Sequence, residues 1–352
     1  MTHRPDDARP RTLPPALLRL GLPRDPRGPR HLATFLVTTA ATVLVTRAFL
    51  AAAGYPQLGG DGLHIAHVLW GGLLMAVAFV LLLSFAGPTL RPLGALVGGV
   101  GFGLFVDEVG KFVTSDNDYF YEPTAAIIYA TVVGLGLVAE TLHGRRPPDP
   151  REALAGAVDE AVAGVVGGFT PAARRRAEAR LAEAGDVPGA DETRVLLRSI
   201  EEDHAELPDP VGAVASGVVR VLHTMVRARF VPWLAVAVLV GTSGVTVASA
   251  VARWWGGDDV PGWVVGGALV ASTVSVVLCG VGLAQVRRDA VEGYRWFRRA
   301  VLVSLLVTQF FLFRIAQWDA SWGLLVDLLV LGVVGAELEV LRRRREERDT
   351  AA

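Results

Sequence analysis

The sequence predicts an all-α integral membrane protein that crosses the bilayer about eight times. Hydrophobic residues make up 52% of its 352 residues, and the mean hydropathy of +0.42 is high for a soluble protein. The apolar residues fall in long blocks, several of which reach the roughly 20 residues that a helix needs to cross a membrane. Arginine is concentrated in alternate loops between the blocks, which is typical of a multi-pass protein.

The distribution of arginine also predicts the orientation of the spans. Loops 54–63 and 113–121 contain no arginine, whereas the segments 145–229 and 287–299 are rich in it. Because cytoplasmic loops of membrane proteins are enriched in basic residues, we expect both termini in the cytoplasm and the protein in the cell membrane. The predicted spans are 32–53, 64–86, 92–112, 122–141, 229–252, 261–285, 299–318 and 321–340.

These spans divide the chain into five parts. Residues 1–31 are expected to form a flexible basic cytoplasmic arm, and 32–141 a first half of four membrane helices. Residues 142–228 form a cytoplasmic helical insert. A second half of four helices follows at 229–341, and 342–352 form a basic cytoplasmic tail.

The cytoplasmic insert is predicted to be a small helical bundle. A first helix is expected at 150–168, and a second is expected to begin with Thr170 as its N-cap and Pro171 at its first position. A third is expected at about 191–205. The insert has no signature of a metal, nucleotide or nucleic-acid site, so it either packs beneath the membrane part or binds a protein partner.

Lys111 is the only lysine among 34 basic residues. A composition that uses arginine everywhere else indicates that Lys111 stands where a compact, titratable amine is needed. Asp107 and Glu108 lie four and three residues before it, so a helix places either carboxylate beside the amine. An alternative interpretation is a plain ion pair.

Eight ionisable residues are predicted to lie near the extracytoplasmic ends of the spans. Charged groups at that depth are costly unless they are paired or hydrated, so they usually face a bundle interior or a water-filled cavity. We therefore expect an outward-facing polar pocket that acts as a proton relay. Its expected residues are His64, His67, Asp107, Glu108, Lys111, Arg47, Arg314 and Asp327.

The third span contains two pairs of glycines spaced four apart, Gly94 with Gly98 and Gly99 with Gly103. Small residues at this spacing let helix backbones approach one another closely. This helix is therefore expected at the centre of the bundle, with the Asp107–Glu108 pair.

Three functions fit the pocket, and the sequence does not decide between transport and catalysis. The first is proton-coupled binding or translocation of a small solute or ion. The second is a membrane-embedded metal-dependent hydrolase or lipid-modifying enzyme, in which His64, His67 and Glu108 hold zinc and Asp107 handles protons. The third is a membrane sensor or scaffold that acts through its insert. The expected partners are the lipid bilayer, a small solute or ion and a protein bound to the insert, with no nucleic acid.

Overall fold

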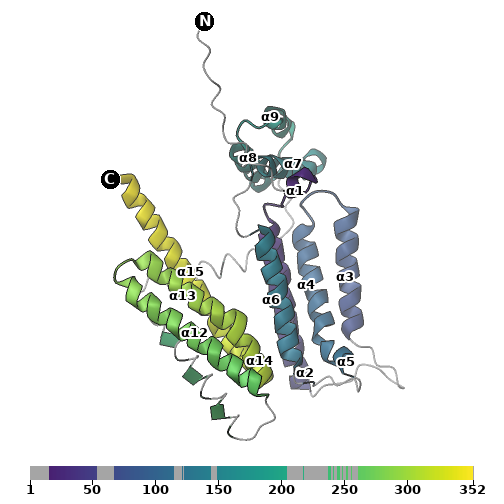
Figure 1. Cartoon of the computed structure of the whole chain (residues 1–352). Coiled ribbons are helices and arrows are strands. Elements are labelled where there is room, and N and C mark those ends of the chain that lie inside the picture. The colour runs from purple at the N-terminus through teal and green to yellow at the C-terminus, as the bar shows by residue number, and fades with distance from the viewer. Residues whose placement is uncertain are drawn as a thin grey trace, which may run out of the picture. The chain divides into compact units, whose positions relative to one another are not determined.

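All regular structure in the described part of the chain is helical, which confirms the all-α prediction. The computed structural model describes residues 16–53, 67–114, 121, 123–143, 149–203 and 261–351, with scattered positions between 217 and 255. The helices are α1 (Ala16–Arg19), α2 (Gly28–Ala53), α3 (His67–Ser84), α4 (Arg91–Asp107), α5 (Val109–Val113), α6 (Thr124–His143), α7 (Pro150–Gly167), α8 (Pro171–Ala184), α9 (Ala190–Ser199), α12 (Gly262–Val286), α13 (Ala290–Val303), the π-helix η1 (Ser304–Thr308), α14 (Gln309–Ala316), the 3-10 helix η2 (Gln317–Asp319) and α15 (Ala320–Ala351) (Figure 1).

Four of these helices, α2, α3, α6 and α12, are long and apolar enough to cross a membrane. They correspond to the first, second, fourth and sixth predicted spans. A multi-pass membrane protein is therefore supported by length and composition, while the count of eight spans stays a prediction. Most of the predicted fifth span, 229–252, lies outside the described residues.

The other predicted spans differ from the helices in their boundaries. The third is broken at Glu108, between α4 and α5. The helical run expected from 299 begins at Ala290, because the Asp289 carboxylate accepts hydrogen bonds from the Val291 and Glu292 N–H groups and caps it. The last helix continues to Ala351, since arginine and glutamate are good helix formers and nothing in its tail stops it.

The chain divides into two compact units, and α2, α3, α4 and α6 each contribute residues to both. The first unit comprises Met1–Thr42, Gly71–Phe102 and Gly136–Pro208. Within it, α7, α8 and α9 lie together (Figure 1). Their shared core includes Ala157, Phe169 and Leu181.

Local signals set the ends of these three helices. The Thr170 hydroxyl accepts from the Ala173 N–H with Pro171 in the first turn, as predicted. The third helix ends at Ser199, earlier than the predicted 205. The chain then extends, because the Phe169 N–H donates to the Glu201 carbonyl and the Asp203 N–H donates to the Phe169 carbonyl.

Ion pairs tie this helical insert to the segment before α2. Arg24 pairs with Glu152 at 2.6 Å, and Arg27 with Glu160 at 3.3 Å. Part of the range 1–31, expected to be a flexible arm, is therefore held in place. The helix of the first predicted span likewise begins at Gly28, ahead of the predicted residue 32. Residues 1–15 lie outside the described residues.

The glycines of α4 allow close helix packing in the first unit, as the glycine pattern predicted. A Cβ on Gly99 would overlap the Thr38 side chain of α2. A Cβ on Gly101 would lie 2.8 Å from both the Gly71 carbonyl oxygen and the Met75 nitrogen of α3. Helix α4 thus packs directly against the backbones of both neighbours.

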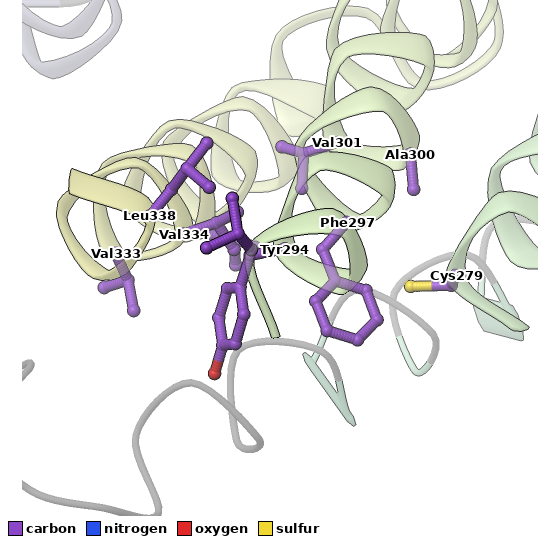
Figure 2. Close-up of a cluster of buried hydrophobic side chains, with 10 residues drawn as sticks. Cys279, Tyr294, Phe297, Ala300, Val301, Val333, Val334 and Leu338 are labelled. Atoms are coloured by element: carbon purple, nitrogen blue, oxygen red, sulfur yellow. The ribbon is translucent and has the colours of Figure 1, made fainter. Parts of the chain in front are cut away.

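The second unit comprises Val43–Trp70, Gly103–Leu135 and Asp209–Ala352. Its largest core lies among α12, α13 and α15, and Figure 2 shows Phe297 and Val301 from α13 and Val334 and Leu338 from α15 in this cluster. Cys279 is buried in the same core. It packs there against apolar side chains.

Candidate functional site

The site lies in the second unit, where α4 ends and α5 begins. In an unbroken helix, the Asp107 carbonyl would accept from the Lys111 N–H. Instead, the Lys111 N–H donates to the Glu108 carbonyl at 3.0 Å. The Asp107 carbonyl accepts from the Arg47 guanidinium at 2.8 Å. The guanidinium of α2 therefore satisfies the backbone group that the break in the helix leaves without an intrahelical partner.

Asp107 is fully buried and has a different partner on each carboxylate oxygen. Arg47 Nε donates to Oδ1 at 2.6 Å, and His67 Nε2 lies 3.0 Å from Oδ2. Arg47 is only 8% exposed. Because a buried charge is costly without a partner, this pair depends on both members.

Glu108 is 1% exposed and joins three groups. Its Oε1 lies 3.1 Å from Lys111 Nζ and 3.3 Å from His67 Nδ1. Its Oε2 accepts from the Val68 N–H at 3.2 Å, in the first turn of α3 as described.

His67 bridges the two carboxylates. Each of its ring nitrogens faces a carboxylate oxygen, and only the doubly protonated imidazolium can donate from both. The other four side chains of the network are two cations, Arg47 and Lys111, and two anions, Asp107 and Glu108. A proton on His67 thus changes the charge of the five side chains from zero to +1.

Arg47 also contacts an aromatic ring near the C-terminal end of α14. Its guanidinium carbon lies 4.8 Å from the centre of the Trp318 ring in η2. This cation–π contact joins the network to the turn between α14 and α15. At this turn, Gln317 has a φ of 48°, the one positive φ outside glycine in the described residues.

Five of the predicted pocket residues therefore lie in one network, which comprises Arg47, His67, Asp107, Glu108 and Lys111; "the network" below means these five. His64 lies outside the described residues. Asp327 contacts Ser304 at 2.8 Å, and Arg314 lies in the last turn of α14. The assignment of these three to the same pocket stays a prediction.

The predicted zinc site shares two residues with the network. His67 and Glu108 are adjacent, while the third expected ligand, His64, lies outside the described residues. No group of three histidine, cysteine or acidic residues in the described part of the chain has an arrangement that could hold a metal ion.

Several buried polar residues of η1 and α14 were not predicted as site residues. Ser304, Thr308 and Gln309 are at most 6% exposed. Their spacing of four and five residues within an apolar segment is the signal that could have identified them, because it places them near one face of a helix.

Comparison with family models, curated proteins and solved structures gives no match. The function is therefore inferred from the residues themselves.

Proposed function

We propose that the protein is a multi-pass membrane protein that binds or translocates a small solute or ion, coupled to a proton held by the network. The bridging position of His67 between Asp107 and Glu108 carries this proposal. Ionisable groups within membrane helices commonly form proton relays and substrate pathways. Imidazole is suited to such exchange, because its charge changes near physiological pH in an ordinary environment.

The break in the helix offers a way to couple the proton to a solute. Loss of the His67 proton would leave a ring lone pair facing a carboxylate oxygen, which is unfavourable. The carboxylate could then turn towards another cation or release Arg47, whose guanidinium also holds the Asp107 carbonyl. Broken membrane helices form the binding sites of many transporters, because their free backbone groups face the substrate.

The proposed topology has eight spans, both termini in the cytoplasm and the network towards the extracytoplasmic side of the cell membrane. The arginine-rich and arginine-free loops support it. In this topology a solute would reach the network from outside the cell.

The experiment is a flux assay in proteoliposomes that contain a pH-sensitive dye and carry an imposed pH gradient. The probes are sodium, potassium, chloride, nitrate, a mixture of amino acids and a mixture of sugars, added one at a time. We expect one probe to cause proton movement with the original sequence and none with Asp107→Asn. Glu183→Gln is the control, because Glu183 is exposed and, among the described residues, forms its ion pair with Arg180 of its own helix.

Two results would contradict the proposal. One is the absence of proton movement with every probe in the original sequence, at a protein density for which circular dichroism shows intact helices. The other is equal proton movement in Asp107→Asn.

A further inference from the structure

A second buried polar row lies where η1 and α14 face α15. Ser304 Oγ donates to Asp327 Oδ2 at 2.8 Å, and Gln309 Nε2 donates to the Ala320 carbonyl at 2.5 Å. As the residue number rises along η1 and α14, the partner's number falls along α15, so the helices run antiparallel. Along the helix, Thr308 therefore lies between these two contacts.

Asp327 is a buried carboxyl group without a basic partner. It is 3% exposed, and in the described part of the chain its hydrogen-bond partner is the neutral hydroxyl of Ser304. No arginine, lysine or histidine of these residues forms an ion pair with it. An isolated carboxylate in an apolar interior is strongly unfavourable, so it needs either a proton or a bound cation.

The neighbouring oxygen atoms favour a bound cation. The Thr308 side chain is 2% exposed, and its hydroxyl oxygen has no hydrogen-bond partner among the described residues. Ser304 and Thr308 are four residues apart and so share a face of the helix. A proton on Asp327 would still leave the Thr308 hydroxyl oxygen without a partner. A cation could bind both this oxygen and the Asp327 carboxylate.

The backbone beside Asp327 is not a regular α-helix. Ser304–Thr308 form a π-helix, a feature often found at functional sites. Gly323 presents no side chain opposite this segment, and a Cβ built on it would lie 3.4 Å from Gln309 Oε1. The Gln309 side chain therefore packs beside the Gly323 backbone, four residues before Asp327 in α15.

We propose that Asp327, Ser304, Thr308 and Gln309 form a binding site for a sodium ion. Carboxylate, hydroxyl and amide oxygens are hard ligands, which suit a hard cation such as sodium. The ion would neutralise Asp327 and join η1 to α15. This proposal does not depend on the function proposed for the network.

The test measures the thermal stability of the full-length protein in detergent, with increasing sodium chloride at constant ionic strength maintained by choline chloride. A ligand that binds the folded state raises the melting temperature with its concentration. We expect a sodium-dependent rise that Asp327→Asn abolishes. Thr308→Val, which removes one oxygen and keeps the shape, should raise the half-saturating sodium concentration at least tenfold.

Thr273→Val is the matched control, because its hydroxyl is exposed and donates to the Leu269 carbonyl of its own helix. It should leave the sodium response unchanged. The proposal is overturned if sodium has no more effect than choline in the original sequence, which would indicate a protonated Asp327. An unchanged response in Thr308→Val would also overturn it, and this variant remains informative if Asp327→Asn does not fold.

Discussion

Arg47 donates to Asp107 twice, once to the carboxylate and once to the main-chain carbonyl. One guanidinium therefore neutralises a buried charge and satisfies the end of α4. The charge state of the network and the shape of the broken helix are linked through this single side chain.

Replacement of Arg47 should destabilise the protein strongly. Arg47→Gln leaves the Asp107 carboxylate buried without its cation, which costs about 3 kcal/mol or more. Arg47→Lys should lose less stability than Arg47→Gln, because an ammonium keeps the positive charge. It should still lose some, because an ammonium lacks the planar pair of donors. The stability of both variants is measured as the free energy of unfolding in detergent micelles. Arg194→Gln, at an exposed pair within α9, should have little effect. Equal effects of Arg47→Gln and Arg194→Gln would contradict the double contact.

Lys111 should not be replaceable by arginine. It pairs with Glu108 three residues away, and the wider guanidinium of Lys111→Arg would not keep the compact contact beside a buried carboxylate. We expect at least a tenfold loss of proton movement in the flux assay. Arg295→Lys is the reverse control, since Arg295 pairs with Glu292 at the same spacing. Full activity of Lys111→Arg would favour the simpler interpretation of an ordinary ion pair.

The close packing of α3 against α4 predicts opposite effects for two glycine substitutions. Gly101→Ala should destabilise the protein by about 1–3 kcal/mol, because the new methyl group meets backbone atoms that cannot move aside. Gly134→Ala has open space around it in α6. It should be neutral or stabilise the protein by up to roughly 1 kcal/mol. Thermal unfolding of the two variants side by side gives the comparison, and a stable Gly101→Ala would show that the helices lie farther apart.

The ion pair between Glu152 and Arg24 predicts an acid-dependent loss of stability. The hydrogen bond from Arg24 lowers the pKa of the Glu152 carboxyl to about 2, from an ordinary value of 4.5. Because the folded state binds this proton less readily than the unfolded state, the contribution is complete above pH 4.5 and lost as the pH falls towards 2. It amounts to roughly 3 kcal/mol.

Stability curves of the original sequence and of Glu152→Gln measure this contribution. The difference between them should be constant above pH 5 and shrink below about pH 4. A constant difference down to pH 3 would contradict the assigned pair. Glu183→Gln is the control, as its carboxylate is exposed.

Local features of the structure could be predicted from the sequence, and contacts between distant segments could not. Thr170 and Pro171 are signals of a helix start that need no tertiary context, and the glycine spacing of α4 predicted its close packing. Helical spacing predicted that Lys111 would pair with Asp107 or Glu108, and the structure pairs it with Glu108. The break at Glu108 was not predicted, because no proline marks it and the nearby Gly110 lies within α5. The Asp107 carbonyl at the break accepts from Arg47, which is 60 residues away in the sequence.

The contact of Asp327 with Ser304 is a second example of a contact between distant segments. The depth of Asp327 in the last span suggested a place in the pocket with His67 and Asp107. Its contact with Ser304 depends on the pairing of η1 with α15, which a single sequence does not reveal. Residues 24–31 similarly lack an apolar pattern, and their order comes from acidic partners in the insert.

The most direct test of the central claim is a pH jump applied, without any solute, to proteoliposomes adsorbed on a solid-supported membrane. If the network exchanges a proton with the extracytoplasmic side, the original sequence gives a transient current that scales with the amount of protein. His67→Gln and Asp107→Asn abolish this current, and Glu183→Gln retains it. Currents of equal size in the original sequence, His67→Gln and Asp107→Asn would show that the proton binds elsewhere and would contradict the account.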